Sequence, residues 1–84
     1  MEEPADLVFI SPTSALISNS GGGDILKLDM KSGNTSQFAA VETPKGLFFD
    51  PISNQVVVAS FDKRKLFFYN VSDGKFIGLG YVDE

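Results

Sequence analysis

The chain has 84 residues, of which 43% are hydrophobic and 21% charged, and its net charge is −4. This length allows one small globular domain, and the acidic balance argues against a nucleic-acid partner or an anionic membrane surface. The chain has neither histidine nor cysteine, so it lacks the commonest general base, the commonest transition-metal ligand and any thiolate.

Strand patterns follow one another along almost the whole chain. Residues 1–6 show no pattern and are predicted to be an N-terminal extension. Eight short strands are then predicted, at 7–10, 15–19, 24–29, 34–40, 46–49, 55–60, 65–70 and 75–82. Turn-forming residues separate them, and no segment shows the 3.6-residue period of a helix. The sequence therefore predicts an all-β fold, and no apolar stretch approaches the ~20 residues of a membrane span.

The second half of the chain repeats the first. Residues 47–51 match 8–12 as an apolar triplet, a small polar residue and a proline, and 56–60 matches 15–19. The offset is 39 residues at the start and 41 afterwards, close to the ~40–45 residues of a four-stranded propeller blade. We therefore predict two four-stranded antiparallel β-propeller blades, at 7–42 and 43–84.

Both repeats contain the same turn between their third and fourth strands. An Asx residue, three further residues and a glycine run from Asp29 to Gly33 and again from Asn70 to Gly74. The Asx side chain can accept hydrogen bonds from backbone N–H groups ahead of it, and glycine takes up a positive φ without strain. We predict a positive φ at both glycines.

Three strands of the second repeat are continuous apolar runs, at 47–49, 56–58 and 66–69. Such runs indicate that both faces of a sheet are covered. Two blades covering each other leave two outer faces bare, and ~3 repeats are the usual minimum for stability. We therefore expect a fragment of a larger propeller or a self-associating unit, not a stable lone monomer. Three copies would give six blades and four would give eight, within the ~4–8 of known propellers.

The segment Thr-Pro-Lys-Gly-Leu-Phe-Phe-Asp-Pro at 43–51, followed by Asn54 and the β-branched strand at 56–60, resembles the NHL and YVTN class of propeller repeats. Repeats of that class read P-x-G-apolar-x-apolar-D-P before a β-branched strand that ends in small residues. The resemblance covers residues 7–82, and it is clearest in the second repeat. The first repeat has no glycine at the position of Gly46 and has Ser11 in place of the aspartate. The resemblance implies the fold and leaves the function open, because related propellers bind proteins, RNA or sugars, or act on substrates with a metal.

One segment carries a local positive charge beside an aromatic ring: Phe61, Lys63, Arg64 and Lys65. This candidate partner surface could contact a phosphate or an acidic partner, whereas a solvated hairpin tip is the plainer interpretation. Other large aromatic residues near strand ends are predicted to pack between blades, with a partner groove as the alternative. They are Tyr69, Phe76 and Tyr81.

Asp50 ends an innermost strand, so it is the carboxylate that could face a central channel. Some related six-bladed propellers hold a metal there, with ligands from several blades. A lone carboxylate is a poor site for a hard cation, and aspartates in turns usually bond to the backbone. We predict that Asp50 caps its turn, and we predict no cofactor, no metal ligand and no catalytic residue.

We expect a non-enzymatic interaction or scaffold module of the propeller type. Its partners would be further blades, from a longer chain or from copies of itself, and possible protein ligands. Two alternatives stay open. The chain could be part of a metal-dependent lactonase-like or hydrolase-like propeller whose catalytic residues lie on other blades, or a repeat whose role is only to build a ring.

Overall fold

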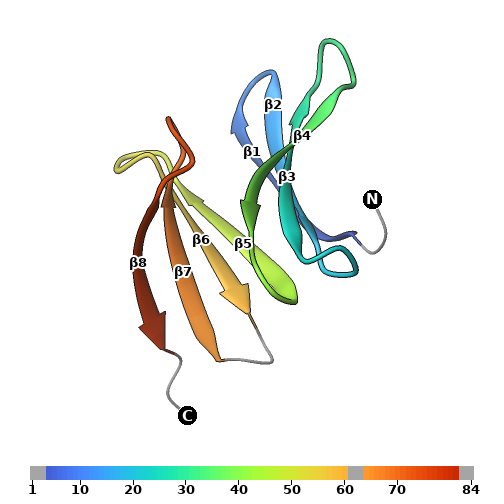
Figure 1. The fold of residues 1–84 in the computed structure, drawn as a ribbon. Coiled ribbons are helices and arrows are strands. Elements are labelled where there is room, and N and C mark those ends of the chain that lie inside the picture. The colour runs from blue at the N-terminus through green and yellow to red at the C-terminus, as the bar shows by residue number, and fades with distance from the viewer. Residues whose placement is uncertain (1–3, 61–63, 82–84) are drawn as a thin grey trace.

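The computed structural model describes residues 4–60 and 64–81, and all of their regular structure is β (Figure 1). Its eight strands are β1 (Pro4–Ser11), β2 (Ser14–Asn19), β3 (Asp24–Asp29), β4 (Thr35–Ala40), β5 (Pro44–Asp50), β6 (Gln55–Ser60), β7 (Lys65–Asn70) and β8 (Phe76–Tyr81). Within these described ranges no helix is long and apolar enough to cross a membrane.

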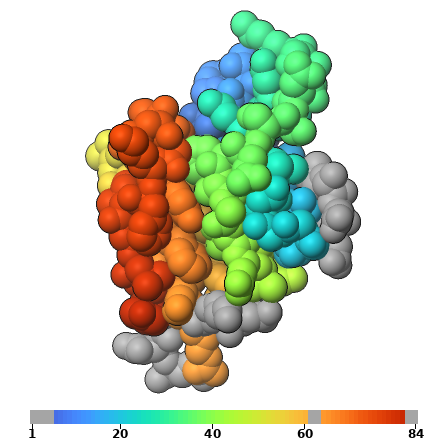
Figure 2. Space-filling model, viewed as in Figure 1, coloured from blue at the N-terminus to red at the C-terminus, as the bar shows by residue number. Residues whose placement is uncertain are grey.

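The strands form two sheets in the order β1-β2-β3-β4 and β5-β6-β7-β8. Every neighbouring pair is antiparallel. Figure 1 shows the first sheet in blue to green and the second in yellow-green to red, and Figure 2 shows the two sheets in contact along the molecule. The predicted all-β fold with two four-stranded antiparallel sheets is confirmed.

The first strand begins earlier than the sequence predicts, within the expected extension at 1–6. Pro4 pairs with Asn19 and Asp6 with Ser18, with a register shift between the two pairs. The irregular register hides the strand from a test of apolar alternation. The polar residue at position 6 also has a long-range role, because its Oδ2 accepts the backbone N–H of Leu47 at 2.9 Å.

The shared turns have the predicted conformation. Gly33 and Gly74 have φ values of 77° and 72°. Their N–H groups donate to the carbonyl oxygens of Asp29 and Asn70 at 2.7 and 2.8 Å. The side-chain oxygens of the same two Asx residues accept the N–H groups two residues ahead, at 3.0 and 2.9 Å. One local motif therefore builds the same turn twice.

We expect Gly33→Val and Gly74→Val each to lower the free energy of unfolding by ~1–3 kcal/mol, because a β-branched residue is strained at positive φ. Gly74→Val should be the more damaging, since a Cβ there would lie 3.4 Å from the carbonyl oxygen of Phe38, whereas one at Gly33 meets nothing within 4 Å. Gly33→Asn is the control, because asparagine tolerates this conformation. Urea unfolding at one protein concentration measures all three, and a valine variant at position 33 as stable as the asparagine variant would contradict the assignment.

The core lies between the two sheets. Residues paired directly across neighbouring strands project from the same face, so the registers define an inner and an outer face for each sheet. The buried inner residues of the first sheet include Leu16, Ile25 and Ala39. Those of the second sheet include Val56, Val58 and Tyr69. Four of these side chains are wholly inaccessible: Leu16, Ile25, Val56 and Val58.

Hydrogen bonds join the sheets where β5 lies beside β1 and β2. The buried Ser18 hydroxyl donates to the carbonyl oxygen of Lys45 at 3.1 Å. The Asp6 carboxylate accepts the N–H groups of Leu47 and, at 2.8 Å, of Leu7. These bonds fix how the second sheet sits against the first, because they connect backbone atoms of one sheet to side chains of the other.

We expect Asp6→Ala to lower the free energy of unfolding by ~1 kcal/mol, the usual net value of one lost hydrogen bond. The change specific to this hydrogen bond is faster hydrogen exchange at the Leu47 amide, because the amide loses its acceptor. Asp29→Ala is the matched control, because its carboxylate accepts an N–H within its own turn. Unchanged exchange at Leu47 in Asp6→Ala would show that this bond does not join the sheets.

Candidate functional site

The candidate partner surface is only partly within the described residues. Phe61 and Lys63 lie outside them. Arg64 is exposed in the turn before β7 and has a positive φ of 53°. Lys65 opens β7, pairs with Tyr81 across the strands, and places its ammonium 6.0 Å from the Tyr81 ring centroid. Arg64 therefore faces solvent, and Lys65 lies over its own sheet.

A row of aromatic rings crosses from the first sheet to the second. The ring centroids of Phe38 and Tyr69 are 6.1 Å apart, those of Tyr69 and Phe76 are 5.6 Å apart, and those of Phe76 and Phe67 are 6.3 Å apart. Tyr69 lies between the sheets as predicted, and its burial raises the pKa of its hydroxyl.

The two aromatic residues of β8 are more exposed than the prediction of packing between blades implies. Phe76 is 55% exposed and Tyr81 66% exposed. Both lie on the edge strand of the second sheet, whereas the contacts with the first sheet are made mainly by β5 at the opposite edge.

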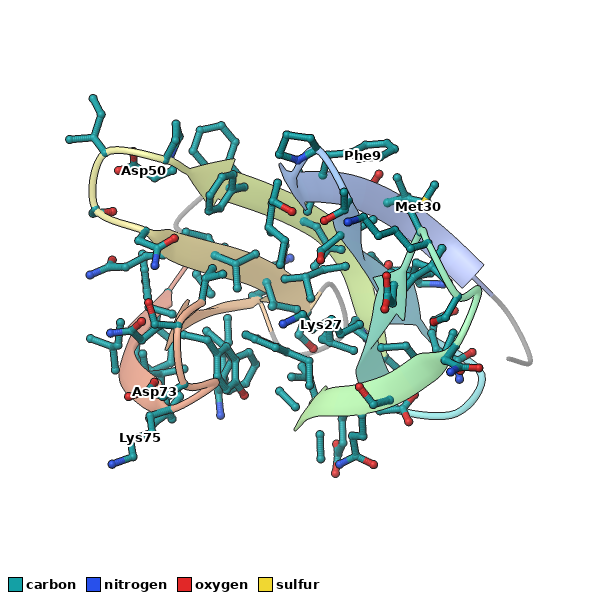
Figure 3. The ribbon with its side chains drawn as sticks, turned by 90° about the horizontal axis from the view of Figure 1, so that it is seen from above. Phe9, Lys27, Met30, Asp50, Asp73 and Lys75 are labelled. Atoms are coloured by element: carbon teal, nitrogen blue, oxygen red, sulfur yellow. The ribbon has the colours of Figure 1, made fainter. Side chains whose placement is uncertain are left out.

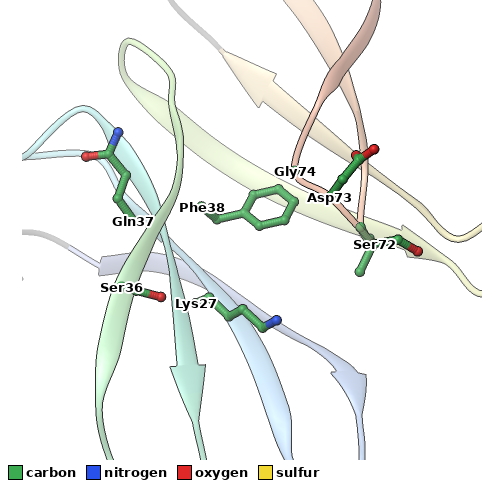
Figure 4. A pocket seen from close by; sticks show the side chains of 8 residues that line it. Lys27, Ser36, Gln37, Phe38, Ser72, Asp73 and Gly74 are labelled. Carbon is green, nitrogen blue, oxygen red and sulfur yellow. The ribbon is translucent and has the colours of Figure 1, made fainter.

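An open groove of about 210 Å³ lies between the sheets beside this aromatic row (Figure 4). One wall comes from β3 and β4 and the other from the turn between β7 and β8. Its lining is Lys27, Ser36, Gln37, Phe38, Val71, Ser72, Asp73 and Gly74.

The groove is polar and carries both signs of charge. Lys27 extends into the space between the sheets, and Asp73 lies at the β7–β8 turn (Figure 3). The Asp73 carboxylate accepts the N–H of Lys75 at 3.0 Å, and the Ser72 hydroxyl accepts from the Asn54 amide at 2.7 Å. These groups suit hydrogen bonding to a polar chain, and the Phe38 ring adds an apolar surface.

Little in the sequence indicates this groove, because its walls come from different repeats. The one available signal is Lys27, a charge between Leu26 and Leu28 in the third strand. The residue 41 positions later is Phe68, so the first repeat is polar where the second is aromatic. That difference marks a place where the two sheets do not close tightly.

Asp50 caps its own turn, as predicted. Its Oδ1 accepts the N–H of Ile52 at 3.0 Å, and its Oδ2 accepts the Ser53 hydroxyl at 2.9 Å. The Ser53 hydroxyl, followed by the backbone N–H groups, lowers the pKa of this carboxyl. Figure 3 shows Asp50 at the β5–β6 turn, well apart from Asp73. Among residues 4–60 and 64–81, no three acidic side chains come together as a metal site.

We expect Ser53→Ala to raise the pKa of Asp50 toward its ordinary value, because the largest cause of the lowering is removed. Ser53→Thr keeps the hydroxyl and should leave the pKa low. A depressed pKa means that the charged carboxylate stabilises the turn above the ordinary pKa of aspartate, and that this contribution is lost as the pH falls through the lowered value. NMR titration of the Asp50 carboxyl carbon measures it, and equal pKa values in the alanine and threonine variants would contradict the assignment.

The outer face of each sheet is apolar. On the first sheet, the cross-strand pairs place on this face Leu7, Phe9, Ala15, Ile17, Leu26 and Leu28. On the second sheet they place there Phe48, Val57, Ala59, Leu66 and Phe68. Leu7 is 48% exposed, Phe9 52% and Phe48 66%. Ala15 and Ile17 are nevertheless buried within the chain, at 0% and 5%, and the remaining side chains of the two faces are half-buried or exposed. The outer faces are therefore partly bare, mainly at Leu7, Phe9 and Phe48.

The comparisons with known proteins concern the fold alone. No family model and no curated protein matches the sequence. Hydrazine synthase from Kuenenia stuttgartiensis is similar in structure, with a TM-score of 0.76 at 15% identity, over 87% of this chain and 21% of that chain. The chain therefore spans about a fifth of the length of the chain that it matches. The likeness and the two four-stranded antiparallel sheets together show a β-propeller-like fold.

Proposed function

We propose that the chain is a non-enzymatic scaffold module, a pair of NHL-like or YVTN-like blades that is built into a larger propeller and presents its loops to a protein partner. The observation that supports this proposal is the pair of bare apolar outer faces. Leu7, Phe9 and Phe48 are large apolar side chains that are about half exposed or more, and another sheet packed on these faces would cover them.

The exposed apolar area of the two outer faces is large for a chain of 84 residues. One face of a small blade carries several hundred Å² of apolar surface, which corresponds to several kcal/mol at ~25 cal/mol per Å². Domains of this size have little stability to spare. Covering both faces would therefore add several kcal/mol to a small total stability, and further blades are the covering that this fold accepts on each side.

The residues of the second repeat support the proposed repeat type. Pro44 is buried at the start of β5, and a Cβ at Gly46 would lie 3.7 Å from that of Ala59. Asp50 caps the following turn, and Asn54 ends it with a φ of 56°. Pro44, Asp50 and Asn54 therefore have local structural roles that need no catalytic function, whereas a Cβ at Gly46 would make only an ordinary van der Waals contact.

The partner surface that we propose is the basic segment of Phe61, Lys63, Arg64 and Lys65. The structure describes Arg64 and Lys65 of this segment: Arg64 is exposed directly before β7, at the end of the sheet opposite the β7–β8 turn. A basic segment on an otherwise acidic chain suits an acidic protein partner, and its contribution would weaken with salt.

Fluorescence of the dye ANS tests the bare faces directly. We expect the dilute chain to bind ANS, and Phe9→Ser/Phe48→Ser to bind much less, since these two rings are the most exposed apolar groups of the two faces. Ile52→Ser is the control, because Ile52 is 96% exposed in a turn. Absence of ANS binding by the parent, at a dilution where it is monomeric and folded, would contradict the proposal.

The competing enzyme function has its own test. We expect no turnover of lactones or esters by the chain, with or without divalent metal ions, and no metal-dependent rise in melting temperature. Turnover that disappears in Asp50→Ala would replace the scaffold proposal with a metal-dependent hydrolase.

A further inference from the structure

We infer that the outer face of the second sheet binds the outer face of the first sheet of another copy, so that copies join head to tail into a closed ring. This inference rests on the proposed function and identifies what covers the bare faces. It follows from how the repeat distributes its residues between the inner and outer faces.

The offset of 41 residues relates the inner face of one sheet to the outer face of the other. Leu16 and Ile25, on the inner face of the first sheet, correspond to Val57 and Leu66, on the outer face of the second. Four other correspondences relate the outer face of the first sheet to the inner face of the second: Ala15 to Val56, Ile17 to Val58, Leu26 to Phe67 and Leu28 to Tyr69.

The registers extend this relation to β1 and β5, because Phe9 pairs with Ala15 and Phe49 pairs with Val56, the equivalent of Ala15. The internal interface therefore joins two different kinds of face, and one of each kind is left free. A second copy placed against the second sheet, in the way that the second sheet sits against the first, repeats the same contact between equivalent positions. Such a contact is heterologous, and it closes when the rotation per copy divides a full turn. A two-fold contact between identical faces has no counterpart inside the chain.

The chemistry of the free faces suits this junction. Lys27 places a charge at the internal interface, whereas its equivalent on the outer face of the second sheet is Phe68. A Cβ at Gly80 would lie 3.3 Å from the ring of Phe68, so this ring lies flat along the sheet. The matching positions on the outer face of the first sheet are aliphatic. Ala15 and Ile17 are already buried within one copy, so the half-buried Leu26 and Leu28 are the ones that a second copy would contact. The junction would therefore bury apolar groups without burying a charge, which avoids a desolvation penalty.

Two single substitutions can block one face each. Phe48→Glu places a charge on the outer face of the second sheet, and Phe9→Glu places one on the outer face of the first. Both side chains are more than half exposed, at 66% and 52%, so neither charge enters the core. Ile52→Glu, at the 96% exposed turn position, adds the same charge away from both faces.

Light scattering coupled to gel filtration reads the outcome. We expect the parent and Ile52→Glu to have the mass of three or four copies at micromolar concentration, and each blocked variant to be a monomer. A 1:1 mixture of Phe9→Glu and Phe48→Glu should form a dimer with one copy of each, because each supplies the face that the other retains. The double variant should stay monomeric in every mixture. A blocked variant that still dimerises by itself would overturn the head-to-tail arrangement.

Isotope-filtered NMR on the parent provides a second measurement that needs no variant. In a mixture of labelled and unlabelled chains, intermolecular contacts are expected between Phe68 or Leu66 and Leu26 or Leu28. Contacts confined to other residues would overturn the inference. If the parent is monomeric and binds ANS, the bare faces exist but a second copy does not cover them. That result would refute the head-to-tail ring and would still agree with the proposed scaffold function. A monomer that melts cooperatively without binding ANS would refute both.

Discussion

The melting temperature of the chain is expected to rise by several degrees for each tenfold increase in its concentration. Folding and association are coupled when one sheet face is stable only against another copy, and mass action then favours the folded state as the concentration rises. A tenfold change in concentration corresponds to ~1.4 kcal/mol per junction. For a domain of 60–100 residues, ~1 kcal/mol shifts the melting temperature by ~4–8 °C.

The expected rise in melting temperature with concentration is large because few residues of a single copy are fully buried. Nine hydrophobic residues of the described chain form the buried core, and further large apolar side chains of both outer faces are exposed. Burying these exposed side chains therefore adds substantially to a small core. Circular dichroism from micromolar to millimolar concentration measures the shift.

The blocked variants provide the control for this experiment. Phe9→Glu/Phe48→Glu should melt at one low temperature regardless of its concentration, whereas Ile52→Glu should follow the parent. A parent whose cooperative melt does not move over this range would contradict the closure argument and leave the outer faces without a structural role.

Local sequence determined the parts of the fold that local interactions stabilise. The Asx and glycine residues at both ends of each shared turn were sufficient to predict the positive φ of Gly33 and Gly74, because the hydrogen bonds of the turn lie within five residues. The cap at Asp50 was predictable for the same reason. Its donors, Ile52 and Ser53, are two and three residues away.

Features that depend on contacts between the repeats were not predictable in the same way. The start of β1 was missed because Asp6 bonds to Leu47, 41 residues away. The groove was missed because Phe38 meets a turn of the other repeat. The exposure of Phe76 and Tyr81 depends on which strands the first sheet reaches, and the pattern of apolar residues in a single strand does not contain that information.

The largest effect of a single substitution is expected at Leu16. Leu16→Ala should lower the free energy of unfolding by ~2–5 kcal/mol, because it removes a wholly inaccessible side chain and leaves a cavity between the sheets. Small domains have total stabilities of ~5–15 kcal/mol, and a chain of this length lies near the lower end. We therefore expect the variant to be largely unfolded at room temperature.

Leu7→Ala separates the loss of core packing from the loss of association. Leu7 lies on the neighbouring strand but on the outer face, 48% exposed, and pairs with Ile17, whereas Leu16 pairs with Val8 of the core. Leu7→Ala should destabilise the dilute chain much less than Leu16→Ala does, because Leu7 is only half buried within one copy, and it should weaken the rise of the melting temperature with concentration. Leu16→Ala should be destabilised at every concentration, because the contact that it loses lies within one copy. Equal losses from the two substitutions in dilute solution would mean that the outer face of the first sheet is packed inside a single copy, and the assignment of inner and outer faces would then be wrong.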